Sequence, residues 1–390
     1  MSAIPRYRAG HEPALLSAGF RPFFLFAALW AAIAVPLWLT MFAGAAPSPA
    51  ALPASVWHGH EMVFGYGGAV VAGFLLTAVP NWTGRMPLQG GPLAALVLLW
   101  LVGRLACLAP SNPFAALADL AFPLAFLLVI AREVLAGRNW RNLPVVVALS
   151  LLLLANVLVH AGASGWLADA ALGNRLGIAT LAMLISLIGG RIVPSFTRNW
   201  LARMRPAVAP PASFGTMDRA ALLLTGFALL IWVAAPTARL LAPVAILAGL
   251  AQWVRLWRWH GAAAWREPLL IVLHLGYGWL GAGLLLLGLP VFFPAFPASV
   301  ALHALTVGAI GTMTLAVMTR ATLGHTGRKL TAGSGTVVIF ALITLAALAR
   351  LAAPFAGGHV LPVLVLAGTA WSGAFSLFAL LYGRLLTTPR

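Results

Sequence analysis

Long runs of apolar residues, broken only by short polar stretches, dominate this chain. The first long run, GFRPFFLFAALWAAIAVPLWL, begins at Gly19. Hydrophobic residues make up 62% of the 390 residues and charged residues only 8%, whereas the surface of a water-soluble protein has to be largely polar. About 20 consecutive apolar residues are needed to span a bilayer. The sequence therefore predicts an all-α polytopic membrane protein.

Twelve apolar runs are counted as transmembrane helices. They cover residues 20–42, 57–80, 91–109, 114–131, 143–161, 173–194, 219–235, 237–256, 267–290, 298–320, 333–352 and 359–383. We expect a single membrane domain over 1–390, with a cytoplasmic N-terminal segment, 1–19. A Pro-rich cytoplasmic loop is expected over 195–218.

The positive charges predict the orientation of these spans. Lys and Arg together number 24. If the N-terminus is cytoplasmic, only Arg104, Arg175, Arg239 and Arg350 fall on the outer side. Cytoplasmic loops of membrane proteins carry an excess of Lys and Arg, so both termini are predicted in the cytoplasm. The net charge of +17 then needs no nucleic acid partner to explain it.

The inner ends of spans two, six and ten resemble one another. They read LLTAVPNWTGR, GGRIVPSFTRNW and MTRATLGHTGR, and they place Thr83, Thr197 and Thr326 near a turn. These intervals are near one third of the chain length, which favours three pseudo-repeats of four helices. The alternative is that any inner helix end attracts Arg and Thr.

Four histidines fall at one depth near the outer face. They are His58 and His60 in span two, His160 in span five and His303 in span ten. Imidazole is a common ligand of copper, zinc and haem iron, and ionisable groups inside membrane spans are costly and usually functional. We expect these residues to bind metal. A hydrogen bond to a neighbouring carbonyl is the alternative for each ring.

Helical spacing separates the two histidines of span two. Residues i and i+2 lie about 200° apart on an α-helix, so His58 and His60 do not face one ion if both are helical. His58 shares a face with Glu61, whose carboxylate is expected to orient the His58 ring. Arg175 lies at the same level and is expected in the surroundings of the metal.

Span nine carries a histidine with glycines on the same face. His274, Gly278 and Gly281 follow i, i+4, i+7 spacing in LLIVLHLGYGWLGAGL. Such glycines would let a flat macrocycle lie close to the backbone, so these residues are candidates for binding a cofactor. Helix–helix packing through small residues is the alternative.

Two residue types are not expected to contribute to a site. The lone cysteine, Cys107, is expected to be a small packing residue, and a cysteine-based metal site is not expected. The acidic residues lie mostly at span ends, so we expect no chain of buried carboxylates.

The quoted motifs of spans one, two, nine and ten resemble the NnrS family. The resemblance rests on GFRPFF, WHGHEMVFGYGGAVVAGFLLTAVPNWTGR, LLIVLHLGYGWLGAGL and HALTVGAIGTMTLAVMTRATLGH, and it runs over nearly the whole chain. It implies twelve spans, bound haem and copper, and a role in bacterial resistance to nitric oxide linked to denitrification. His58, His60, His274 and His303 lie inside the matching motifs, whereas His160 is a candidate because of its depth alone.

We therefore expect a haem- and copper-binding protein of the bacterial inner membrane that lowers nitrosative stress. His60 and His303 are the expected axial ligands of a haem, of b type, and nitric oxide or a related small ligand is expected to arrive through the lipid. Whether nitric oxide is bound or converted stays open, because the pair of adjacent histidines found in haem–copper oxidases is absent. A transporter and a factor that delivers metal to a respiratory enzyme are the alternatives.

Overall fold

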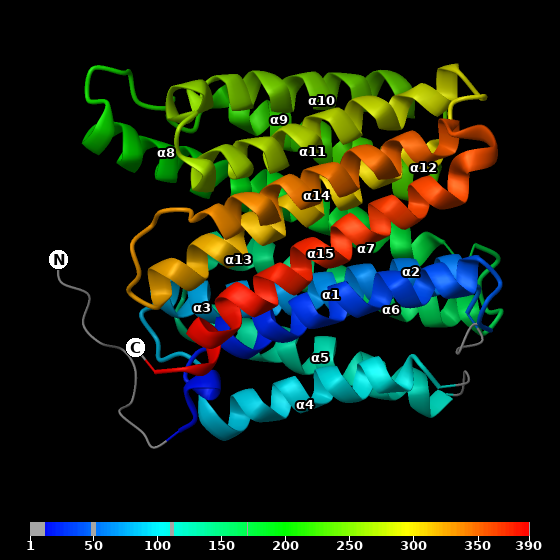
Figure 1. Cartoon of the computed structure of the whole chain (residues 1–390), viewed down its shortest axis with the longest axis horizontal. Helices are drawn as coiled ribbons and strands as arrows, with labels where there is room; N and C mark the ends of the chain where they lie inside the picture. The colour runs from blue at the N-terminus through cyan, green and yellow to red at the C-terminus, as the bar shows by residue number, and fades with distance from the viewer. Residues whose placement is uncertain (1–11, 48–51, 110–112, 170, 390) are drawn as a thin grey trace. The chain divides into compact units, whose positions relative to one another are not determined.

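The computed structural model describes residues 12–47, 52–109, 113–169 and 171–389, and within these ranges it is helical without strands. Of the predicted N-terminal segment, residues 1–11 lie outside this description. Ten helical stretches are long and apolar enough to span a membrane, which confirms the all-α membrane class. They are Phe20–Phe42 (α1), Ala54–Thr83, Pro113–Ala136 (α5), Trp140–Ala163, Leu172–Met204, Thr216–Ala234 (α9), Pro268–Phe292 (α11), Ala298–His325, Ser334–Phe355 and Gly357–Thr387 (Figure 1).

Two further apolar helices are shorter. Gly90–Ala106 (α4) and Leu241–Trp257 (α10) have 17 residues each and correspond to predicted spans three and eight. Helix length alone therefore identifies ten of the twelve predicted spans.

The described chain divides into two compact units. The first contains the residues up to Gly177, together with 325–327 and the chain from Phe378 onward, and the second contains Ile178–Gly324 and Arg328–Leu377. In the first unit α4 packs against α5, and α5 packs against α6 (Leu143–Ala163). In the second unit α10 packs against both α9 and α11 (Figure 1). No polar linker in the sequence marks this division.

Three of the spans contain a π-helical segment. These segments are Glu61–Gly67 in span two, Ile185–Gly189 in span six and Ala304–Gly311 in span ten. They occur in the same three spans whose inner ends resemble one another in sequence. π-Helical turns are rare and are frequent at functional sites, so these spans are the first places to look for a site.

Spans two and ten agree in more detail. His60 and His303 are each the last residue of the short α-helix that leads into the π segment. Twenty-four residues after each histidine, Gly84 and Gly327 turn the chain in the left-handed region, with φ of 74° and 73°, where a glycine has no steric penalty. This equal spacing supports a common origin for the two spans, and the threefold repeat stays a prediction.

The helix of span six ends later than the sequence predicted. A loop was expected over 195–218, whereas α8 (Gly190–Met204) continues through Pro194. Proline lacks the N–H that would bond to the carbonyl four residues earlier. That carbonyl, of Gly190, instead faces Nη2 of Arg255 at 3.5 Å. This cation comes from α10, so the continuation of the helix past Pro194 does not follow from the sequence of span six alone.

Arg255 is at the centre of a buried network in the second unit. Its Nε donates to Asp218 Oδ1 at 2.7 Å. Its Nη1 donates to Tyr277 Oη at 2.7 Å and to the carbonyl of Ser186 at 2.8 Å. Tyr277 Oη in turn donates to Gln252 Oε1 at 2.5 Å. The network pairs each charge and ties the π segment of span six to α9, α10 and α11, so it is a structural element.

Candidate metal centre

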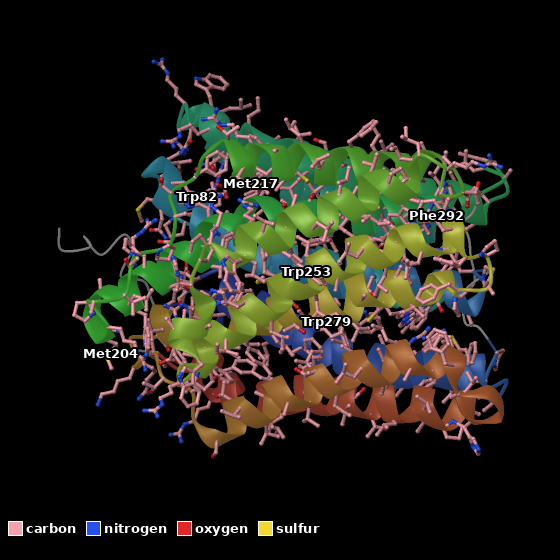
Figure 2. All side chains as sticks on the ribbon, turned by 90° about the horizontal axis from the view of Figure 1, so that it is seen from above. Trp82, Met204, Met217, Trp253, Trp279 and Phe292 are labelled. Atoms are coloured by element: carbon pink, nitrogen blue, oxygen red, sulfur yellow. The ribbon has the colours of Figure 1, made fainter. Side chains whose placement is uncertain are left out.

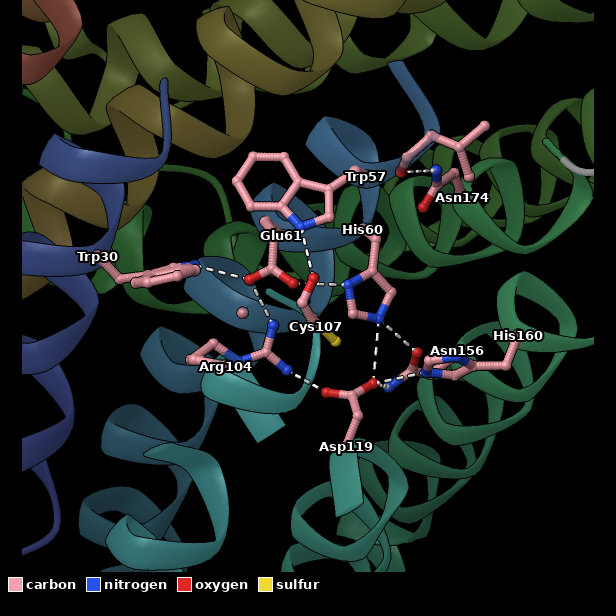
Figure 3. A network of polar contacts seen from close by, with 12 residues as sticks. Trp30, Trp57, His60, Glu61, Arg104, Cys107, Asp119, Asn156, His160 and Asn174 are labelled. Carbon is pink, nitrogen blue, oxygen red and sulfur yellow. Dashed lines mark hydrogen bonds and ion pairs between the residues drawn. The ribbon is translucent and has the colours of Figure 1, made fainter. Parts of the chain in front are cut away.

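The first unit contains a fully buried cluster of ionisable side chains. His60 and Glu61 come from span two, Arg104 from α4 and Asp119 from α5 (Figure 3). The exposed fraction is 0% for His60, Glu61 and Asp119 and 3% for Arg104. Charged groups are buried this deeply only when they are paired or bind a metal ion.

Arg104 links the two carboxylates of the cluster. Its Nη1 donates to Glu61 Oε2 at 2.5 Å and its Nη2 donates to Asp119 Oδ1. The indole N–H of Trp30 adds a second hydrogen bond to Glu61 Oε2, at 2.8 Å. Two carboxylates and one guanidinium leave one negative charge unbalanced. Because such a charge is costly in a low-dielectric interior, the cluster favours a further cation, either a proton on His60, which then donates from both ring nitrogens, or a bound metal ion.

Both ring nitrogens of His60 face oxygen atoms. Nδ1 lies 2.9 Å from Glu61 Oε1, and Nε2 lies 3.0 Å from Asp119 Oδ2 and 2.8 Å from Asn156 Oδ1. A neutral imidazole has only one N–H, so it cannot donate on both sides. A metal ion on Nε2 with Nδ1–H donating to Glu61 would satisfy both sides, and this carboxylate–histidine–metal arrangement is common in metalloproteins.

Four side chains could hold such an ion. His60, Cys107, Asp119 and His160 each offer one ligand atom, and these atoms all lie within 4.8 Å of one another. His160 Nε2 lies 2.9 Å from Asp119 Oδ2. Ligands bound at 2.0–2.3 Å in a tetrahedron lie about 3.3–3.8 Å apart, so small side-chain adjustments bring the four atoms to bonding geometry.

Cys107 corrects one expectation from the sequence. It is buried, as expected, but its sulfur is also one of the four ligand atoms. Its position is held by its own carbonyl, which accepts a hydrogen bond from the indole of Trp57 at 3.0 Å. The sequence prediction excluded a cysteine-based site because the chain has one cysteine, but a single thiol can complete a mixed set of ligands, so Cys107 is a candidate ligand.

Two carboxylates are buried side by side, although only a longer chain of buried carboxylates was considered from the sequence. Glu61 and Asp119 lie inside the apolar spans and share one guanidinium. Position along a span predicted a location near its end, but it could not show that Arg104 on another helix faces both carboxylates. Asn156, which donates to Asp119 Oδ2 at 2.8 Å, was missed as well. One signal for it exists, since it precedes His160 by four residues and shares its helix face.

Glu61 orients a different histidine from the one predicted. The spacing of an α-helix paired it with His58, but it bonds His60, the residue before it, at the point where the π-helical segment begins. His58 stacks on Trp38, with ring centroids 4.3 Å apart and an interplanar angle of 24°. The two histidines of span two therefore have different surroundings, as expected for two helical residues.

The remaining candidate of the predicted outer layer, His303, belongs to the second unit. Its Nδ1 lies 2.7 Å from the carbonyl of Ser299, which matches the hydrogen-bonded alternative for these rings. The same bond would present Nε2 as the ligand atom, because it fixes the proton on Nδ1. A role of His303 in binding metal stays a prediction.

The glycine face of span nine is occupied by a neighbouring helix. His274 Nδ1 lies 2.9 Å from the carbonyl of Leu270. Trp253, labelled in Figure 2, lies on α10. A Cβ on Gly281 would lie 2.4 Å from its indole. Trp253 Nε1 also donates to the carbonyl of Gly278 at 3.0 Å. A macrocycle does not fit on this face, and the observed packing is the alternative predicted for small residues.

Arg175 forms an ion pair near the start of α7 (Leu172–Leu184). Its Nη2 donates to Asp169 Oδ2 at 2.5 Å. The hydrogen bond from Arg175 lowers the pKa of the Asp169 carboxyl, which lies in the loop before the helix. The expected place of Arg175 in the surroundings of a metal stays a prediction.

One known protein family matches nearly the whole chain. A protein-family model described as NnrS protein matches residues 14–390. No curated protein matches the chain.

Proposed function

Because the chain belongs to the NnrS family, we propose that it binds a copper ion in the buried cluster and acts in the response to nitric oxide. The observation that carries this proposal is the convergence of four ligand atoms, from His60, Cys107, Asp119 and His160, within 4.8 Å. Copper, when bound there, would supply a redox-active centre able to bind a small ligand.

The set of ligands suits copper. Thiolate sulfur is a soft ligand that selects copper, zinc and iron–sulfur clusters, and imidazole suits copper and zinc. With a Cys107 thiolate, the unbalanced negative charge of the cluster rises to two, which a divalent ion neutralises. Zinc takes similar ligands, so metal analysis has to distinguish the two.

Burial argues for a resident ion. A factor that hands metal to another protein needs ligands that water and a partner can reach. Three of the four ligands here have exposed fractions of 5% or less, and His60 and Asp119 have 0%. This favours a bound cofactor over the metal-delivery alternative.

The haem implied by the family resemblance is assigned to His303. Haem iron receives four ligands from the porphyrin and needs only an axial imidazole from the protein. His303 is the counterpart of His60 in the equal spacing of spans two and ten, but Ala304 stands where span two has Glu61. We infer that the carboxylate-rich site takes a free ion and that the single imidazole takes the iron of a b-type haem.

We also propose that α4 and α10 cross the membrane. A 17-residue helix is about 26 Å long, close to the ~30 Å hydrocarbon core. This gives twelve spans, in three groups of four, with both termini in the cytoplasm of a bacterium. The distribution of Lys and Arg along the chain supports this orientation.

Metal analysis and optical spectroscopy of the purified protein test the proposal. We expect one copper per chain in the wild type and in His58→Ala, and loss of copper in His60→Ala and His160→Ala. His303→Ala should lose haem and keep copper. Copper absent from the wild type, or retained in both His60→Ala and His160→Ala, would refute the assignment of the cluster.

A further inference from the structure

A small cavity between span two, α5 and α6 reaches the buried cluster of charged side chains. Its volume is about 30 Å³. At one end it is lined by Arg104, Asp119 and Asn156, which belong to the cluster. The other lining side chains are apolar and include Phe122 and Leu152. The cavity therefore has mainly apolar walls and touches one ligand of the proposed metal, Asp119.

The size of this cavity limits what can enter it. A cavity needs about 10–15 Å³ of such volume to hold one water molecule, so this one holds a molecule of about two heavy atoms. The apolar walls disfavour an ion. In the metal-free protein, the negative charge of Glu61 and Asp119 that Arg104 does not balance also repels anions such as nitrite.

The helices over the cavity face lipid. Leu128 on α5 is 60% exposed and Leu154 on α6 is 47% exposed, and large apolar side chains exposed in this way on a membrane helix contact acyl chains. The cavity wall includes Gly68, where a Cβ would have nothing within 4 Å. A larger side chain at this glycine would therefore begin in open space.

We propose that this cavity is the entry route and docking pocket of a small uncharged gas, of the size of nitric oxide, which reaches the cluster from the bilayer. This inference rests on the proposed function for the role of the ligand, but the route itself does not depend on the metal. The apolar gas is concentrated in lipid, and the passage would exclude water-borne ions from the same ligands.

The lone cysteine reports on arrival at the cluster, because the sulfur of Cys107 lies within 4.8 Å of a carboxylate oxygen of Asp119, which lines the cavity. Iodomethane is small, apolar and soluble in lipid, and it methylates a thiolate: the sulfur of Cys107 attacks the methyl carbon, the C–I bond breaks and iodide leaves. Iodoacetate reacts in the same way but carries a negative charge. The full-length chain in lipid nanodiscs, stripped of metal with a chelator, is treated with each reagent, and modified Cys107 is measured by mass spectrometry.

Gly68→Leu is designed to narrow the cavity, because Gly68 lines it and an added Cβ there meets open space. Gly226→Leu is the matched control, because Gly226 also has nothing within 4 Å and lies on α9 in the second unit. We expect iodomethane to react at least tenfold faster than iodoacetate, relative to their rates with a free thiol. Gly68→Leu should slow methylation at least fivefold, and Gly226→Leu should not change it.

Equal relative rates for the two reagents, or no effect of Gly68→Leu, would overturn the route. A parallel sample loaded with copper separates this result from the proposed function. Protection of Cys107 by copper supports ligation, whereas methylation that is unchanged by copper argues against the metal site and leaves the route to be judged from the stripped protein.

Discussion

Glu61 Oε1 lies 2.9 Å from Nδ1 of His60, the residue that precedes it in the chain. His60 is the last residue of an α-helix, and Glu61 is the first residue of the π-helical segment that follows. Arg104 and Trp30 hold the other carboxylate oxygen. The carboxylate is thereby fixed behind the imidazole, and Nε2 of His60 is directed at the other ligands.

Replacing Glu61 by Gln should weaken copper binding by about 10–100-fold, the usual effect of removing a carboxylate behind a ligating histidine. The amide keeps the shape and can still accept the Nδ1 proton, but it lacks the charge that makes the imidazole a better ligand. Competition with a chelator measures the affinity. Glu133→Gln is the control, because Glu133 pairs with Arg85 away from the cluster. An affinity equal to that of the wild type would contradict the role of Glu61.

Replacing Arg104 by Met should destabilise the fold by about 3–5 kcal/mol, because it leaves two buried carboxylates without their cation. Arg132→Met is the control, since the Arg132 side chain is 74% exposed. Thermal unfolding followed by size-exclusion chromatography in detergent gives the comparison.

A compensating variant separates charge from packing at Arg104. Adding Glu61→Gln and Asp119→Asn to Arg104→Met removes every formal charge of the trio, and it should recover a large part of the lost stability. If the triple variant is as unstable as Arg104→Met, packing of the guanidinium rather than its charge is what matters.

Two residues of this site, His60 and His160, were predicted from the sequence. Polar residues are rare in the spans, so His60 and His160 stood out, and the charge distribution placed both near the outer face. Cys107 and Asp119 were missed because a ligand is recognised by its neighbours, and these come from helices whose packing the sequence does not reveal. The π-helical segments were invisible for a similar reason, since their composition matches that of the α-helices around them.

Cys107→Ser should change the colour of the copper protein and keep the fold. A thiolate bound to Cu(II) gives an intense charge-transfer absorption in the visible range, which imidazole and carboxylate ligands do not give. A hydroxyl at this position is a much poorer ligand, so this band should disappear while some copper stays on the remaining three ligands. The measurement is the optical spectrum of the Cu(II) protein in the His303→Ala background, which should lack the visible bands of haem. A band retained in Cys107→Ser cannot come from another thiolate, because the chain has one cysteine, and it would exclude sulfur ligation.

Gly190→Ala tests whether the buried network around Arg255 supports the π segment of span six. A Cβ on Gly190 would lie 2.2 Å from Nη2 of Arg255, so the guanidinium has to move away from Asp218 and Tyr277, to which it donates at 2.7 Å. Overpacking of this kind typically costs about 1–3 kcal/mol, and the displaced charge adds to that cost. Gly226→Ala has nothing within 4 Å of its Cβ and should be neutral or stabilising by up to about 1 kcal/mol, as in a helix interior. Thermal unfolding of both variants decides the point: equal stabilities would mean that the network yields easily and does not hold the helix in its π geometry.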